Sequence, residues 1–271
     1  IFSNYQYGSR RGYSAQHYLI LMIEQWKKVV DGGGVFGALL TDLSKAFDCI
    51  PHDLIIAKME AYGFQIEALR LIYDYLSNRK QRVKINETYG SWRDIEYGVP
   101  QGSILGPLLF NIHICDLFYF LESTDIASYA DDTTIYAVKE NRQSVISALE
   151  TSSPLLFKWF NNNYMKANSD KSHFLVSSDE PSTLVIDGSI IESNTKEVLL
   201  VITIDKDLKF DDHVNSLCKK AGQKLSALSR LSSYMSFEKR RVIMKAFIES
   251  QFGYCPLIWM FHSRGLNHKI N

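Results

Sequence analysis

The chain has 271 residues, slightly more than one hydrophobic core usually organises, so we expect one lobed domain or two small ones. Hydrophobic residues make up 46% of the sequence and charged residues 22%, which is typical of a globular protein and excludes long disordered stretches. The formal net charge is zero, but residues 42–212 hold 26 acidic and 16 basic side chains, whereas residues 213–271 hold 2 acidic and 10 basic ones. An acidic region can hold divalent cations and a basic one can hold phosphates, although two oppositely charged faces that pack together would give the same pattern.

In the first half of the chain, the hydrophobic pattern predicts helices with strands between them. Apolar side chains at helical spacing predict a helix over residues 14–30, which three glycines end before a strand at residues 35–42. Two helices follow, at residues 53–62 and 65–78. A strand pair at residues 81–85 and 91–97, with its turn at residues 86–90, comes next, and then a further helix at residues 103–120. Asn111, His113 and Asp116 interrupt this apolar helix, so we expect it to be buried in protein rather than to span a membrane.

In the second half, strands come before helices. Two β-rich runs at residues 126–130 and 133–138 flank Asp131 and Asp132 and predict a hairpin. Pro154 cannot continue a helical hydrogen-bond ladder, so we expect it to split a helical pattern into two pieces, at residues 142–149 and 155–163. Strands are expected at residues 174–177, 183–186 and 198–204, and helices from Asp211 onward, which places the domain boundary near Asp211.

No pattern in the sequence predicts secretion or a zinc site. The chain begins with Ile1 rather than methionine, which suggests a fragment, and no charged and then apolar leader follows. The cysteines lack the paired spacing of a zinc site, so we expect simple thiols in a reducing compartment at Cys49, Cys115, Cys218 and Cys255.

Three aspartates adjoin apolar strands. Asp42 follows one strand, and Asp131 and Asp132 lie at the tip of the expected hairpin. Carboxylates beside a core are costly to desolvate and repel one another when they converge, and a bound Mg²⁺ relieves both costs. Two such ions form the arrangement used for in-line phosphoryl displacement. Taken alone, however, an Asp-Asp pair at a hairpin tip is also ordinary turn chemistry.

Three motifs in a fixed order favour the catalytic interpretation. They are LTDLSKAFD at residues 40–48, GVPQGSILGPLLF at residues 98–110 and YADDT at residues 129–133. Glycines in the second motif indicate that backbone approaches another group closely. In this combination the sequence closely resembles the reverse transcriptases of non-LTR, LINE-like retrotransposons of the jockey and CR1 kind, whose motifs A, B and C it matches in this order.

Further segments extend the resemblance over essentially the whole chain. Residues 6–14 look like the stretch before motif A, and residues 199–205 look like motif E. Trp159 and Phe160, with Asn168 and Lys171, look like motif D, and residues 254–259 look like the thumb-side block that follows motif E.

The resemblance implies an α+β fold of the right-hand polymerase type, in which an antiparallel palm sheet carries the acids. Residues 1–210 would then form the palm with partial fingers, the fingers mainly at residues 1–34 and 54–92. Residues 211–271 would form a partial, basic, helical thumb.

The resemblance also assigns catalytic roles. Asp42 and Asp131, with the carbonyl of Leu43, would bind two metal ions, and Asp132 would be an essential neighbour. We therefore expect the strands of motifs A and C to be neighbours in one sheet, with the carboxylates of Asp42 and Asp131 within metal-bridging reach. Lys171 would donate a proton to the pyrophosphate, although an ordinary exposed loop lysine fits this position equally well.

Substrate contacts are implied in the same way. Phe47 would lie under the incoming sugar and exclude a 2′-OH, and Gln101 and Gly102 would lie against the nucleotide. Contacts with the primer and template are expected at Tyr129, Val201, Lys219 and Lys220.

The implied activity is RNA-directed DNA synthesis from dNTPs on an RNA template with a DNA primer. It would use two Mg²⁺ ions, for which Mn²⁺ can substitute, and the protein would hold the hybrid by its backbone and A-like shape. The implied location is nuclear and cytoplasmic, in a ribonucleoprotein without a membrane anchor. A full-length element would add an endonuclease domain in cis.

Three residues depart from the family pattern: Ser9, Pro154 and Val201. Val201 replaces the glycine of the motif E turn, where a β-branched residue adopts a positive φ only with strain. One alternative is an RNA-dependent RNA polymerase, against which Phe47 argues. The other is a catalytically degenerate fragment that at most binds RNA, which Val201 favours and the intact aspartates oppose.

Overall fold

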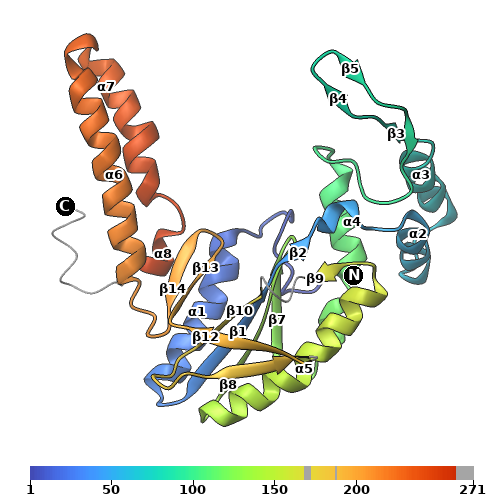
Figure 1. The fold of residues 1–271 in the computed structure, drawn as a ribbon, viewed down its shortest axis with the longest axis horizontal. Coiled ribbons are helices and arrows are strands. Elements are labelled where there is room, and N and C mark those ends of the chain that lie inside the picture. The colour runs from blue at the N-terminus through green and yellow to red at the C-terminus, as the bar shows by residue number, and fades with distance from the viewer. Residues whose placement is uncertain (168–171, 187, 261–271) are drawn as a thin grey trace.

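The computed structural model describes residues 1–167, 172–186 and 188–260. At its centre lies a six-stranded sheet with the strand order β11-β12-β10-β1-β8-β7 (Figure 1). Its strands are β1 (Val35–Thr41), β7 (Asp125–Tyr129), β8 (Asp132–Lys139), β10 (His173–Val176), β11 (Thr183–Ile186) and β12 (Ser189–Asn194). Neighbouring strands are antiparallel except for the parallel pair β10 and β12. The fold is therefore α+β, as expected.

Both faces of the sheet are covered, which explains why β1 reads as one continuous apolar run. Phe36, Ala38 and Leu40 belong to a core shared with α1 (Ala15–Asp31), whereas Leu39 belongs to a second core shared with α5 (Arg142–Asn162). Successive side chains of a strand point to opposite faces, so alternate residues of β1 enter different cores. The two cores fix β1 from both sides and thereby fix the position of the residue that follows it.

The predicted helices of the first half are confirmed, and most of their predicted ends lie within a few residues of the observed ends. Ser14 caps α1, since its hydroxyl accepts a hydrogen bond from the His17 amide. The next helices are α2 (His52–Ala61), α3 (Ile66–Leu76) and α4 (Leu105–Ile114). The expected helix at residues 103–120 is too long, because α4 gives way to a short 3-10 turn at Leu117–Tyr119. Near the end of α4, the Lys58 ammonium donates a hydrogen bond to the His113 carbonyl at 2.7 Å.

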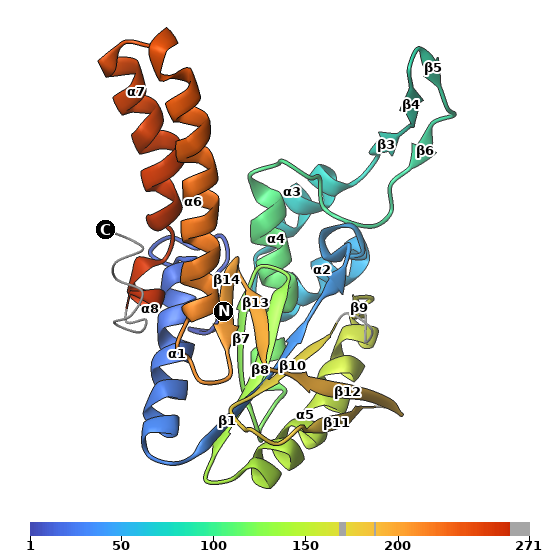
Figure 2. The same ribbon diagram turned by 60° about the vertical axis from the view of Figure 1, so that its left-hand side comes forward.

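The strand pair between α3 and α4 is more fragmented than predicted. It consists of β3 (Lys80–Gln81) with β6 (Arg93–Asp94) and of β4 (Lys84–Ile85) with β5 (Thr88–Tyr89). The turn is confined to Asn86 and Glu87 rather than spanning residues 86–90, because Asn86 adopts a φ of 52° and lets the chain reverse within two residues. This ribbon projects from the body of the molecule (Figure 2).

The prediction that Pro154 splits a helix is wrong, since α5 runs from Arg142 to Asn162 with Pro154 inside it. Buried residues on both sides of the proline, such as Leu149 and Leu156, belong to the same core and hold both halves of the helix against the sheet. The Ser153 hydroxyl also donates to the Leu149 carbonyl at 2.6 Å, in the turn that precedes the proline. Tertiary packing therefore outweighs the local penalty of the proline.

The prediction of one strand at residues 198–204 is also wrong. This segment is a hairpin of β13 (Lys196–Leu199) and β14 (Ile202–Asp205), because Leu200 and Val201 both have a positive φ. Strand β12 and the small pair β2 (Leu43–Ser44) with β9 (Lys166–Ala167) were not predicted.

Helices follow from Asp211 onward, as the pattern predicts. Helices α6 (Asp211–Leu231) and α7 (Phe237–Ile243) lie side by side and project from the sheet, at a distance from the β3–β6 ribbon (Figure 1, Figure 2). A π-helical turn at Met244–Ile248 and the short α8 (Pro256–Trp259) bring the chain back toward α1. In the part of the chain that the structure describes, no helix combines the length and the apolar character that a bilayer crossing requires.

His213 connects the first turn of α6 to the β13–β14 hairpin. Its Nδ1 accepts a hydrogen bond from the Thr203 amide at 3.2 Å, and its side chain is buried. Burial, reinforced by the positive charge of Lys220, lowers the pKa of His213 to about 4. The imidazole is therefore neutral in the folded protein well below pH 6.5, where an unfolded histidine gains a proton.

We expect His213 to make unfolding pH-dependent. Between about pH 6.5 and pH 4 the unfolded chain binds a proton at this position that the folded chain does not, so the free energy of unfolding decreases as the pH falls. His213→Asn keeps an acceptor for the Thr203 amide but does not titrate. Denaturant titrations across this range should show a smaller pH slope for the variant, by up to about one proton. The slope that remains in the variant reflects other shifted groups: His113, whose pKa burial lowers to about 3, contributes in the same direction, and Asp132, whose pKa is raised to about 6, contributes in the opposite one. Equal slopes for the two proteins would contradict the assignment.

Candidate active site

The pairing of β1 with β8 brings two aspartates together. The strands are antiparallel and Thr41 pairs with Thr133, so continuing the register by one residue sets Asp42 opposite Asp132. Asp131 precedes Asp132 in the two-residue turn between β7 and β8, in which Ala130 has a φ of 55°. The prediction that the strands of motifs A and C are neighbours is thus confirmed, although 89 residues separate Asp42 from Asp131.

The N-terminal segment supports this turn from behind. A Cβ on Gly8 would lie only 2.3 Å from the Ala130 amide nitrogen, so no side chain fits at that position. The Asn111 side chain donates to the Gly8 carbonyl at 2.8 Å, and the Gln6 side chain donates to the Asn111 carbonyl at the same distance. Ser9, one of the departures from the family pattern, follows with a φ of 52°. The backbone that presents Asp131 is therefore fixed by a glycine contact and by two buried amides.

The three carboxylates interact electrostatically. The pKa of Asp132 is raised to about 6, first by desolvation and then by the negative charges of Asp131 and Asp42. The residue as a whole is exposed, but enough protein atoms surround its carboxyl group for desolvation to be the larger cause. Like charges that converge hold their protons more tightly, and a cation would remove that repulsion.

The donor chemistry of this group fits a divalent cation. Asp42 and Asp132 line one cavity of about 270 Å³, and carboxylate oxygens are the ligands that Mg²⁺ prefers. Within residues 1–167, 172–186 and 188–260, however, no group of three or more histidine, cysteine, aspartate or glutamate side chains is arranged to hold a metal ion. Further ligands would have to come from backbone carbonyls, such as that of Leu43, from water or from a bound substrate.

The β13–β14 hairpin forms the other wall of the same cavity. Val198, Leu199 and Leu200 line it, together with His173 from β10. His173 Nδ1 lies 3.2 Å from Glu197 Oε1, which connects the hairpin to the central sheet. Sequence motifs did not identify His173 or Glu197, because the pair forms only when β10 and β13 meet in the fold.

The turn of this hairpin is unusual for its sequence. Leu200 and Val201 have φ values of 46° and 72°, as in the two-residue turns that normally carry Asn-Gly. The Val201 side chain is 70% exposed, so burial does not compensate for the unfavourable backbone conformation. Val201 therefore adopts the strained, positive φ considered for it from the sequence, and Leu200 does the same.

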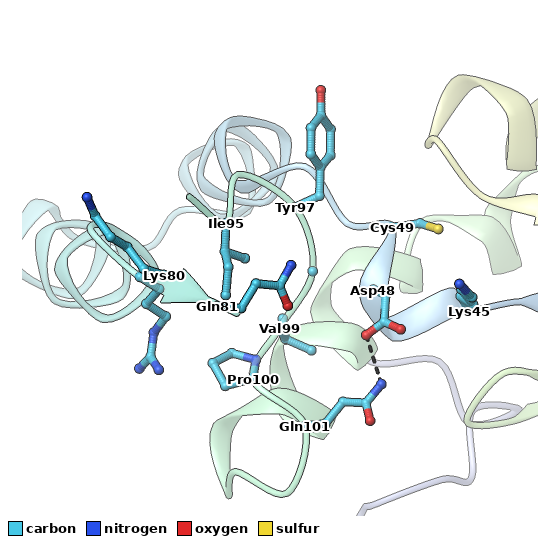
Figure 3. Close-up of a pocket in the computed structure, with 12 residues that line it drawn as sticks. Lys45, Asp48, Cys49, Lys80, Gln81, Ile95, Tyr97, Val99, Pro100 and Gln101 are labelled. Carbon is cyan, nitrogen blue, oxygen red and sulfur yellow. Dashed lines mark hydrogen bonds between the residues drawn. The ribbon is translucent and has the colours of Figure 1, made fainter. Parts of the chain in front are cut away.

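A second, larger cavity lies between motifs A and B and the base of the β3–β6 ribbon (Figure 3). It has a volume of about 820 Å³, and three cationic side chains line it: Lys45, Arg79 and Lys80. Gln101 lines it as well and donates to Asp48 Oδ1 at 2.8 Å. Arg79 is held in place by its hydrogen bond to the Tyr75 carbonyl at 2.6 Å. This cavity therefore presents positive charge and amide groups to a ligand.

Motifs A and B are joined by their backbones. The Val99 amide donates to the Phe47 carbonyl, and the Gly98 amide donates to the Ile50 carbonyl. Gly98 has a φ of 85°, and a Cβ there would lie 2.8 Å from the Asp48 Cα, so the close approach predicted for the motif B glycines is confirmed at Gly98. The Phe47 ring stacks on Phe110 with their centroids 4.3 Å apart and remains half-buried.

The remaining candidate residues are dispersed. Leu43 is buried in β2, and Gly102 has a φ of 76° with open space around it. Tyr129 is half-buried at the end of β7, and Lys219 and Lys220 are exposed on α6. Lys171 and Asn168 lie outside the described residues.

Comparisons with known proteins agree with this arrangement. Residues 1–204 match the family described as reverse transcriptase (RNA-dependent DNA polymerase). The whole chain is 25% identical to the probable RNA-directed DNA polymerase from transposon BS of Drosophila melanogaster and covers 31% of it. Over 72% of the chain the identity is also 25% to the RNA-directed DNA polymerase from mobile element jockey of the same species, of which 22% is covered. The chain thus spans about a third or less of the length of these relatives.

Solved structures share the fold at low sequence identity. Telomerase from Candida tropicalis, in complex with a TWJ fragment of telomeric RNA, superimposes with a TM-score of 0.54 at 12% identity, over 93% of this chain and 43% of the telomerase chain. The corresponding Candida albicans complex gives a TM-score of 0.52 at 12% identity, over 98% of this chain and 45% of that chain.

Replacement of Val201 by glycine should stabilise the protein. Glycine adopts a positive φ without strain, and the gain exceeds the entropy that glycine loses on folding, so we expect about 1 kcal/mol of added stability. Val198 is a matched control, because it is exposed on the same hairpin but does not have a positive φ. Val198→Gly should destabilise. Thermal unfolding of the two variants measures the difference, and a lower midpoint for Val201→Gly would show that the turn is not strained.

Proposed function

Because the chain belongs to the reverse transcriptase (RNA-dependent DNA polymerase) family, we propose that it is the RNA-directed DNA polymerase core of a non-LTR retrotransposon. Its similarity to the telomerase structures identifies the expected right-hand polymerase fold. The observation that carries the proposal is the convergence of Asp42, Asp131 and Asp132 at one end of the central sheet.

The three aspartates are proposed to hold the catalytic cations, with Asp42, Asp131 and the Leu43 carbonyl as ligands and Asp132 beside them. When bound, a pair of Mg²⁺ ions, or Mn²⁺ in their place, supplies the charge that activates a primer 3′-hydroxyl and neutralises the pyrophosphate leaving group. The chain contributes rigid positions: β1 is fixed by two cores, and Gly8 fixes the Asp131 turn. Such fixed positions favour in-line displacement, because small misplacements of the reacting groups are costly in rate.

The 820 Å³ cavity is the proposed site of the incoming dNTP. Lys45, Arg79 and Lys80 match the charge of a triphosphate, and the Gln101 amide, with Gly102 beside it, would face the nucleotide. Phe47 does not line this cavity itself but lies between two residues that do, Lys45 and Asp48, and we propose that its stack on Phe110 fixes it where it excludes a 2′-OH.

The 270 Å³ cavity beside the acids is the proposed position of the primer end, under the β13–β14 hairpin. Tyr129 and Val201 would contact the primer, and Lys219 and Lys220 would contact the backbone of the RNA–DNA hybrid. In this proposal residues 1–210 are palm and fingers and residues 211–271 are the thumb. If the strain at Val201 misplaces the primer end, Val201→Gly should raise kcat more than it changes the KM for dNTP.

The wider setting is proposed on the same basis. The complete element would supply an endonuclease domain in cis, and the protein would work in a ribonucleoprotein in the nucleus and cytoplasm. Lys171 remains the proposed proton donor to pyrophosphate. The second candidate function is a degenerate domain that only binds RNA, which the positive φ of Val201 favours.

The polymerase assignment is tested by metal-dependent incorporation of dTTP on poly(rA)/oligo(dT). Asp131→Asn removes a proposed ligand and should lower incorporation by about 1,000-fold, since metal charge stabilises the transition state by several kcal/mol. Asp125→Asn, at the start of β7 and thus at the opposite end of that strand from the turn with Asp131, should retain activity. If the wild-type protein binds RNA but incorporates nothing with Mg²⁺ or Mn²⁺, the degenerate function replaces the polymerase.

The preference for dNTPs over rNTPs tests whether Phe47 excludes the 2′-hydroxyl. Phe47→Ala removes the ring, so we expect the preference for dNTPs over rNTPs to fall by about 10-fold or more, because the site loses its steric block to the 2′-hydroxyl. Phe157, another half-buried phenylalanine, lies on α5 outside the cavity, and Phe157→Ala controls for lost packing. Single-nucleotide extension with each substrate measures the preference. Unchanged selectivity in an active Phe47→Ala protein would assign Phe47 to packing alone.

A further inference from the structure

The β3–β6 ribbon, residues 80–94, has no hydrophobic core of its own. All of its residues are exposed, among them Val83 at 67%, Ile85 at 68% and Trp92 at 58%. A two-stranded hairpin is at best marginally stable by itself, and here it carries apolar side chains into solvent. Such a projecting ribbon is suited to contacts with another molecule (Figure 2). We call it the arm.

Cations of one strand of the arm lie against aromatic rings of the other strand. The Arg82 guanidinium lies 4.0 Å from the centroid of the Tyr89 ring and 4.5 Å from that of Trp92. Lys84 pairs with Tyr89 across the strands, and its ammonium lies 5.2 Å from the same ring. Residues 79–94 contain five basic and two acidic side chains. Flat rings beside guanidinium groups stack on nucleobases, and the excess positive charge attracts phosphates.

The arm continues directly into the proposed nucleotide site. Lys80 and Gln81 of β3 line the 820 Å³ cavity, as does Ile95, which follows β6. The Ile95 amide donates to the Arg79 carbonyl at 2.9 Å and closes the base of the ribbon. A strand that pairs with the nucleotide in this cavity therefore leaves the cavity beside a basic, aromatic surface. The alternative of a protein partner fits less well, because protein interfaces are depleted of lysine, whereas Lys80 and Lys84 are both exposed on the arm.

We propose that the arm binds single-stranded RNA, by stacking bases on Tyr89 and Trp92 and by pairing phosphates with Arg82, Lys84 and Arg93. The bound segment is the template ahead of the position being copied. The identification of this RNA as template rests on the proposed polymerase function, whereas the binding itself does not.

Fluorescence anisotropy of a labelled oligo(rA) of about 12 nucleotides, without metal or dNTP, measures the binding directly. We expect Trp92→Ala to weaken it by about 10-fold and Trp92→Phe to restore most of the affinity, since loss of one stacked base is usually of this size. Tyr119→Ala is the matched control, because Tyr119 is 77% exposed but lies outside the arm. The control should bind as the wild type does, and an RNA duplex of equal length should be insensitive to Trp92→Ala.

Primer extension locates the bound segment. On templates with a long single-stranded 5′ overhang, Trp92→Ala should extend more slowly than the wild type, whereas on templates that end at the first copied nucleotide the two proteins should be equal. Unchanged oligo(rA) affinity in both Trp92→Ala and Tyr89→Ala would overturn the proposal. A wild-type dimer that Trp92→Ala converts to a monomer, with RNA affinity unchanged, would make the arm a protein interface. If Trp92→Ala weakens RNA binding but the wild-type protein never extends a primer, RNA binding by the arm is supported and the polymerase function is refuted.

Discussion

The antiparallel pairing of β1 with β8 is the constraint on which the rest of the structure depends. It sets Asp42 opposite Asp132 and places Asp131 one residue away, so three like charges converge where the sheet ends. Desolvation is the first cause of the raised pKa of Asp132, and the repulsion from Asp131 and Asp42 raises it further. Two hydrophobic cores, one on each face of β1, hold the strands in this register in spite of it. A one-residue slip would turn Phe36, Ala38 and Leu40 away from α1, so the packing energy of the cores maintains the charged group.

Local sequence patterns predict many of the helices and strands, and the elements that they do not predict depend on long-range packing or on turns with unusual residues. The α1 helix follows from its apolar spacing and its Ser14 cap, and the β7–β8 hairpin follows from two β-rich runs around a turn. The continuous α5 did not follow, because the contacts that tolerate Pro154 come from the sheet. The β13–β14 hairpin was missed because its turn residues, Leu200 and Val201, are poor at positive φ, so no turn signal exists in the sequence.

Some residues of the candidate site can be predicted from sequence motifs, whereas others are found only in the folded structure. Asp42, Asp131, Asp132 and Gln101 each belong to a motif that is continuous in the sequence. The structure brings the three acids together and places Gln101 in the 820 Å³ cavity. Arg79 and Lys80 have no motif of their own, and they reach that cavity only because α3 and the base of the arm fold beside motif B. The His173–Glu197 pair likewise joins strands that are not adjacent in sequence. Residues that line a site from a neighbouring element leave no periodic or spaced signal, so tertiary structure is required to find them.

On the proposed function, the contact between Gly8 and Ala130 bears on how copies of a mobile element lose competence. A methyl group at residue 8 would meet the Ala130 amide nitrogen at 2.3 Å, so even the smallest side chain must displace the turn that carries Asp131. A genomic copy with alanine or serine at this codon would retain every acidic residue and still present them wrongly. With the aspartates in their proposed catalytic role, a survey that scores copies by intact aspartates alone would overcount functional genes, and including the Gly8 codon would correct that count.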